Sequence, residues 1–116
     1  MRFMLIRKAD AHTEAGALAT PGLIRAMGEY LQELARAGVL LAGDGLRPSS
    51  EGARVSFAGG VATVADGPFT QAEELVSGFS LIQARSLAEA VEWVKRWPVA
   101  DGGGNVRIEI RQVTED

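Results

Sequence analysis

Apolar residues recur along this chain either at every second position or at helical spacing. Residues 2–8 place Phe3 and Leu5 on one face and Met4 and Ile6 on the other. A strand that is apolar on both faces belongs inside a sheet that is covered on both sides. The pattern therefore predicts a central strand here, followed by a polar loop over residues 9–19.

Two helices are predicted from apolar stripes with helical spacing. The first begins at the hydroxyl cap Thr20 and at Pro21, where no backbone N–H is needed, and it ends at Gly38. The second begins at the capping box Ser86–Glu89 and ends before Pro98. The stripes comprise Leu23, Met27, Leu31 and Leu34 in the first helix, and Leu87, Ala90, Val91 and Val94 in the second.

The other apolar stretches predict strands. We expect a short buried strand at residues 39–42, with irregular backbone after it over residues 43–48. Two β-prone runs flank Gly59-Gly60, which is a hairpin signal. The strands of that hairpin are residues 53–57 and 61–65, and later strands follow at residues 75–84 and 106–113.

This order predicts a single α+β domain over residues 1–116, a ferredoxin-like βαββαβ sandwich with an inserted β-hairpin. Both helices then cover one face of the sheet. The opposite apolar face of residues 2–8 and 75–84 lacks a cover, and an exposed patch of that size marks an interface. We therefore expect a homodimer, with two sheets packed face to face about a two-fold axis.

Composition narrows the function classes. The 116 residues are 47% hydrophobic and carry a net charge of −3, with the basic residues scattered, so nucleic acid is not an expected partner. No stretch is long enough to span a membrane, and the apolar run Phe3–Ile6 is too short for a signal peptide. The expected location is cytoplasmic.

The stretch Asp66-Gly67-Pro68-Phe69 is followed by Glu-Leu-Val-Ser-Gly-Phe at residues 74–79, and by Glu92-Trp93 in the second predicted helix. This pattern resembles the DGPF branch of the YCII-related family over nearly the whole chain. The resemblance implies a dimeric α/β barrel. It also implies an association with extracytoplasmic-function sigma factors, because many such proteins are encoded beside them or fused to them.

Related YCII proteins carry a histidine on the first helix that has been proposed to act with an aspartate. When the chain is aligned on Gly38, Met27 and Arg36 occupy these two positions. The resemblance therefore does not carry a catalytic mechanism to this chain. His12, the only histidine, lies among small and polar residues and is expected to be an exposed loop residue.

Asp66 is the first candidate site residue, and Phe69 anchors the segment after the turn. The carboxylate of Asp66 is expected to accept hydrogen bonds from the backbone N–H groups that follow it. Because turns at sheet ends often border clefts, both residues are also candidates for binding a ligand.

Glu73 and Glu74 precede a predicted strand, so alternation points one of them inward. That carboxylate is expected to pair with Arg7, Arg47 or Arg107, which makes Glu73 and Arg7 candidate ligand-binding residues. Asp44, between two glycines, is the remaining candidate.

Several kinds of site are excluded. One histidine, no cysteine and no spaced carboxylates predict no metal site. No glycine-rich loop precedes a helix, so no cofactor is expected. Residues 77–82 look like the central strand of an RNA-recognition motif, yet only Phe79 there is aromatic and no basic residue accompanies it.

Two functional hypotheses follow. The first is a small homodimeric accessory or regulatory protein that binds a small molecule. The alternative is an enzyme that performs acid/base chemistry on a small polar substrate with Asp66 or an inward glutamate.

Overall fold

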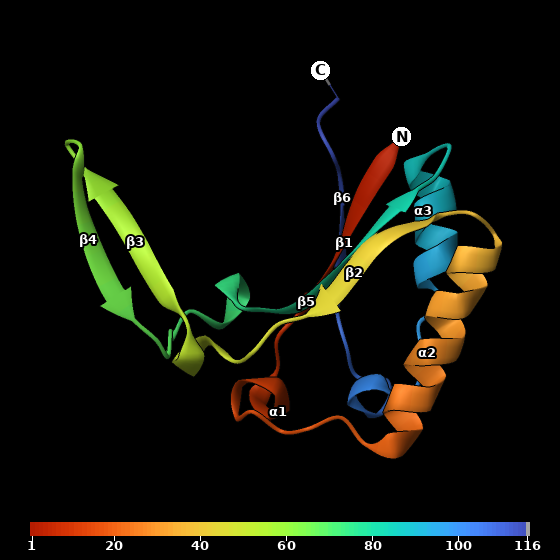
Figure 1. Ribbon diagram of the computed structural model, residues 1–116, viewed down its shortest axis with the longest axis horizontal. Coiled ribbons are helices and arrows are strands. Elements are labelled where there is room, and N and C mark those ends of the chain that lie inside the picture. The colour runs from red at the N-terminus through yellow and green to blue at the C-terminus, as the bar shows by residue number, and fades with distance from the viewer. Residues whose placement is uncertain (116) are drawn as a thin grey trace.

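The computed structural model describes residues 1–115 and has the predicted α+β architecture (Figure 1). Its main sheet is antiparallel, in the order β2-β5-β1-β6. The strands of this sheet are β1 (Arg2–Lys8), β2 (Leu40–Gly45), β5 (Val76–Gln83) and β6 (Ile108–Gln112). The inserted hairpin, β3 (Ala53–Ala58) and β4 (Val61–Asp66), forms a separate sheet of its own. The predicted ferredoxin-like order is confirmed.

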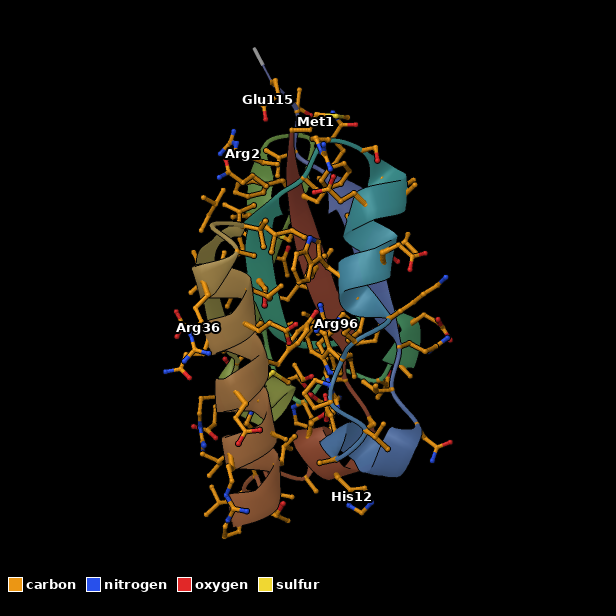
Figure 2. The ribbon with its side chains drawn as sticks, turned by 90° about the vertical axis from the view of Figure 1, so that its right-hand side faces the viewer. Met1, Arg2, His12, Arg36, Arg96 and Glu115 are labelled. Carbon is orange, nitrogen blue, oxygen red and sulfur yellow. The ribbon has the colours of Figure 1, made fainter. Side chains whose placement is uncertain are left out.

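The two long helices, α2 (Pro21–Arg36) and α3 (Leu87–Val94), cover one face of the main sheet (Figure 2). Short elements connect the rest: α1 (Ala11–Glu14) and the 3₁₀ turns η1 (Ser49–Glu51), η2 (Ala72–Glu74) and η3 (Asp101–Gly104). The hydroxyl of Thr20 accepts the N–H of Leu23, and the hydroxyl of Ser86 accepts the N–H of Glu89. Both predicted N-caps are therefore confirmed.

The core lies between the helices and the inner face of the sheet. Its buried apolar residues are Phe3, Leu5, Tyr30, Leu34, Ile82, Ala84 and Ala90. The hydroxyl of Tyr30 donates to the carbonyl of Trp93 over 2.6 Å, and the Tyr30 ring meets that of Trp97 edge to face. Burial raises the pKa of Tyr30 to about 12, so this hydroxyl remains a donor throughout the neutral range.

The opposite side of the sheet carries what we call the open face: Met4, Ile6, Phe79 and Leu81. Register places these residues side by side, since Met4 pairs with Leu81 and Ile6 with Phe79. All four side chains are half-buried, and α2 and α3 lie on the other side of the sheet (Figure 2). The prediction that β1 and β5 are apolar on both faces is confirmed.

Three local predictions were wrong. The strand β2 extends through Gly45 rather than ending at residue 42, and it is largely exposed because it lies at the edge of the sheet. The loop over residues 9–19 contains α1, whose first turn is fixed by reciprocal hydrogen bonds between Asp10 and Thr13. The predicted inward Leu87 is 54% exposed. His12 is exposed, as predicted, although it lies on α1 (Figure 2).

The hairpin β3–β4, which we call the arm, projects away from the rest of the molecule (Figure 1). Gly59 and Gly60 connect its strands with φ angles of 56° and 81°. Positive φ at both positions is the geometry that joins two strands through two residues, and glycine adopts it without steric cost. The predicted hairpin is confirmed.

The base of the arm is organised differently from the prediction for Asp66. The N–H of Gly67 donates to the carbonyl of Gly52, and the N–H of Phe69 donates to the hydroxyl of Ser49. Pro68 has no N–H, so no backbone donor of residues 67–69 is left for the carboxylate of Asp66. The side chain of Asp66 is exposed and makes no hydrogen bond within residues 1–115. The expectation that it organises the turn was wrong.

Gly67 is required by close approach, and its φ is not among the positive ones. A Cβ atom there would overlap the carbonyl oxygen of Ser49. We therefore expect Gly67→Ala to lower the free energy of unfolding by about 1–3 kcal/mol, as overpacking does. Urea denaturation followed by circular dichroism measures this loss.

Gly28→Ala is the matched control for this prediction. Gly28 lies inside α2, where an added Cβ meets nothing within 4 Å. The same substitution should therefore stabilise the protein by about 0.5–1 kcal/mol. Equal effects at both positions would contradict the explanation by close approach.

Candidate functional site

The structure disperses the predicted site residues. Arg7 lies on the helix-covered face of β1, whereas Asp44 pairs with Phe79 on the opposite side of the sheet. Asp66 and Phe69 flank the base of the arm, and Glu73 lies in η2. These five residues therefore do not form a single site.

Arg7 is buried, with 7% of its surface exposed, at the end of β1. Its Nε and Nη2 donate to the two carboxylate oxygens of Asp101 over 3.1 and 2.6 Å. A second Nη2 hydrogen bond goes to Asp10, and Nη1 donates to the Lys8 carbonyl and the Ser77 hydroxyl. A guanidinium has five N–H donors. All of them are used, so Arg7 has none left for a ligand.

Asp101 is the buried partner that completes this network, with 6% of its surface exposed. Its Oδ2 accepts from Arg7 Nε and also from the indole Nε1 of Trp97, over 2.9 Å. Burial acts to raise the pKa of Asp101, but the hydrogen bonds from Arg7 and Trp97 and the charge of Arg7 outweigh it, so the pKa lies below its ordinary value. This carboxylate is ionised at neutral pH and serves as a structural anchor.

Beside this anchor lie two adjoining hollows, which we call together the Lys8–Arg107 hollow. One is an open depression of about 440 Å³ and is lined by Lys8, Glu73, Arg107, Ile108 and Glu109. The other, also open to solvent, has about 490 Å³ and is lined by Lys8, Ala9, Asp10, Gly104, Asn105, Val106 and Arg107. Lys8 and Arg107 therefore lie in both, at the point where β1 ends and β6 begins.

The two cations of the hollow differ in how they are held. Lys8 Nζ donates to the backbone carbonyl of Glu73 over 2.7 Å. Arg107 lies 3.6 Å from the Glu73 carboxylate, and both side chains are largely exposed. Along residues 1–115, the guanidinium of Arg107 has no hydrogen-bond acceptor. Its planar set of donors suits a carboxylate or a similar pair of oxygens.

The prediction that one of Glu73 and Glu74 points inward was wrong. Both lie in the turn η2, outside strand alternation, and both are exposed. Glu73 faces Arg107, one of its predicted partners, and Glu74 pairs with Arg54 over 3.3 Å. Arg54 also stacks on Phe69, 4.1 Å above the ring centroid, so Phe69 serves as part of the base of the arm.

Sequence reasoning named Arg107 only as a pairing partner and did not single out Lys8, Glu109 or Asp101. The strict alternation of residues 106–113 does place Arg107 and Glu109 on one face, opposite Ile108 and Ile110. For Asp101, the available signal was Trp97, because a buried indole N–H requires an acceptor.

Within the part of the chain that the structure describes, no three potential ligands gather as a metal site would require. Over the same residues, none of the helices has the length and apolar character needed to cross a bilayer.

Comparison with known proteins gives the family. The model of the YCII-related domain matches residues 1–115. This chain belongs to the YCII-related family. Among curated proteins, no sequence matches it.

A solved structure supports the same fold for this YCII-related protein. It is a 5-chloro-2-hydroxyhydroquinone dehydrochlorinase, TftG, from Burkholderia phenoliruptrix AC1100, in complex with 2,5-dihydroxybenzoquinone. The alignment covers 100% of this chain and 96% of the other, with 16% identity and a TM-score of 0.55. At this identity the similarity establishes the shared fold.

Removing the charge of Asp101 tests its role as an anchor. We expect Asp101→Asn to lower the free energy of unfolding at neutral pH by about 3 kcal/mol, because the buried Arg7 then keeps only the partly exposed Asp10 as a counter-charge. Because the folded-state pKa of Asp101 lies below the ordinary value of 3.8, its stabilisation is present above that pH and is lost as the pH falls through the folded-state pKa. The difference in free energy of unfolding between the wild type and Asp101→Asn should therefore become smaller at acid pH.

Urea denaturation at pH 7 and at a series of lower pH values measures both effects. The control is Asp44→Asn, because Asp44 is exposed and its carboxylate has no partner elsewhere in residues 1–115. This substitution should change the free energy of unfolding by no more than about 0.5 kcal/mol. A deficit in Asp101→Asn that is the same at every pH would show that the charge of Asp101 is not what stabilises the fold.

Proposed function

We propose that this YCII-related protein is a homodimer that binds a small polar molecule in the Lys8–Arg107 hollow and acts as an accessory or regulatory protein. The observation that carries the proposal is Arg107, whose guanidinium lines both hollows and has no hydrogen-bond acceptor within residues 1–115. A ligand with a carboxylate or an ionised hydroxyl group satisfies these donors. The expected association with a sigma factor is one setting for such a role.

The surroundings of Arg107 support a polar ligand of limited size. Acidic and basic side chains alternate around the hollow, with Glu73 and Glu109 beside Lys8 and Arg107. Glu109 contacts Arg111 over 3.4 Å, and Asp10 is bound by Arg7, so these two carboxylates have partners of their own. The charges that face a ligand are therefore mainly those of Lys8, Arg107 and Glu73.

Another protein with this fold was solved with a small polar molecule bound. The structural neighbour TftG was solved with 2,5-dihydroxybenzoquinone, a ring with hydroxyl groups conjugated to carbonyls. Such hydroxyl groups ionise readily and present oxygen pairs of the kind that a guanidinium binds. This compound is therefore a suitable first probe for the hollow.

An acid/base enzyme has weaker support. A general acid or base needs a pKa tuned by burial or by neighbouring charges. Asp66 and Glu73 are exposed, and the buried carboxylate Asp101 is held by Arg7 and Trp97 and does not line the hollow. The binding role therefore accounts for more of the site than the enzymatic alternative does.

Arg107→Ala tests the binding site. We expect 2,5-dihydroxybenzoquinone or a small aromatic carboxylate such as benzoate to bind the wild-type protein in isothermal titration calorimetry. The variant should bind at least about tenfold more weakly, because a hydrogen bond to a charged group contributes roughly 1.5–3 kcal/mol.

Arg36→Ala is the control for lost positive charge, because Arg36 lies on α2 and points away from the sheet (Figure 2). Its affinity for the same probes should equal that of wild type. Equal weakening in both variants would indicate nonspecific attraction, and absence of binding by every probe would refute the proposed ligand class.

The proposed homodimer has a direct test. Light scattering at micromolar protein concentration should give twice the monomer mass of 12.3 kDa. The physical reason is the open face, since exposed apolar patches of this kind mark interfaces. A constant monomer mass at all concentrations would contradict the homodimer without affecting the binding prediction for Arg107.

A further inference from the structure

The arm was predicted as a hairpin, but its separation from the main sheet was not. Neither of its strands pairs with the main sheet. A compact chain of this length would have a radius of gyration of about 13 Å. The observed value is 15.7 Å, and the arm extends the molecule to 45 Å along its longest axis (Figure 1). An isolated two-stranded hairpin is only marginally stable in water, so the arm requires a surface to pack on.

The two sides of the arm differ in character. Val55 pairs with Val64 and Phe57 pairs with Ala62, so these four residues share one side, which we call the apolar side; the pair Ala53–Asp66 lies on the same side at the base of the arm. Phe57 is 71% exposed and Val64 is 65% exposed. The other side carries the pairs Arg54–Ala65, Ser56–Thr63 and Ala58–Val61, and is the more polar of the two.

The arm and the open face lie on the same side of the main sheet. The helices α2 and α3 occupy the opposite side in Figure 1 and stand in front of the sheet in Figure 2. The arm thus projects on the side of the sheet where a second copy would pack, and neither α2 nor α3 covers that side (Figure 2).

We propose that the arm packs its apolar side on a second copy of this chain and that each copy holds the other in this way. This inference rests on the proposed homodimer and specifies how it is held. The arm has the necessary reach, because strands of six residues span about 20 Å whereas two packed sheets lie about 10 Å apart. An arm directed past the open face therefore extends alongside the partner.

Area explains why the arm is needed. A stable interface buries about 800 Å² of accessible surface on each partner. The open face is a small patch by comparison, because its four half-buried apolar side chains lie on only two strands, β1 and β5. The apolar side of the arm adds Val55, Phe57 and Val64, which are 52%, 71% and 65% exposed.

The arm itself supplies a matched pair of variants. Phe57 is 71% exposed and Val61 is 67% exposed, but they lie on opposite sides of the same hairpin. Phe57→Asp places a charge on the apolar side, and Val61→Asp places the same charge on the other side. Val64→Asp is a second variant of the apolar side, with 65% exposure in wild type.

Sedimentation equilibrium over a range of protein concentrations gives the dimer dissociation constant of each variant. We expect Phe57→Asp and Val64→Asp to raise it at least tenfold, and Val61→Asp to leave it within about threefold of wild type. Hydrogen exchange provides an independent reading without substitution: amides of residues 53–66 should lose protection on dilution, while amides of β1 should keep theirs.

The outcomes separate this inference from the homodimer. If the wild-type protein is monomeric at every concentration, both fail. If it is dimeric and all three arm variants dimerise like wild type, the homodimer stands and the arm proposal is wrong. If Val61→Asp weakens the dimer as much as Phe57→Asp does, the apolar side is not the contact surface and the proposal is again wrong.

Discussion

The buried ion pair between Arg7 and Asp101 joins parts of the chain that lie 94 residues apart. Taking two charges out of water is costly, and such a pair stabilises a fold only when further hydrogen bonds satisfy both groups. Here Asp10, Ser77, Trp97 and the Lys8 carbonyl provide them. The pair therefore fixes β1, α1, β5 and η3 relative to one another. Lys8 of β1 and Gly104 of η3 also line the Lys8–Arg107 hollow, so the ion pair holds two of the segments that border it.

The direction of the arm is likewise set by contacts at its base. Glu14 on α1 accepts both the N–H and the hydroxyl of Ser49, and Ser49 in turn accepts the N–H of Phe69. Arg54 then stacks on Phe69 and pairs with Glu74. The stretch that suggested a ligand site in the sequence is thus largely occupied in orienting the arm. Among the four residues of this stretch, Asp66 has an exposed side chain that makes no hydrogen bond within residues 1–115.

Features with local causes were predictable from the sequence. Thr20, Ser86 and Gly59-Gly60 act on residues within three or four positions, so both long helices and the hairpin were predicted correctly. Features that depend on distant contacts were not. The exposure of β2 follows from its edge position in the sheet, and the requirement for Gly67 follows from the approach of Ser49. The role of Asp101 depends on Arg7, which no local pattern connects to it.

The edge position of β2 has a consequence for how copies of this chain avoid unwanted contacts. The outer side of this strand pairs with no other strand in residues 1–115, and unpaired backbone groups of this kind recruit strands from other molecules. Asp44 lies near the end of β2, between Gly43 and Gly45. A charge on an edge strand disfavours a docking neighbour, and the flanking glycines provide no side chains to strengthen such pairing. Asp44 thus acts as a gatekeeper against growth of the sheet into an open-ended aggregate.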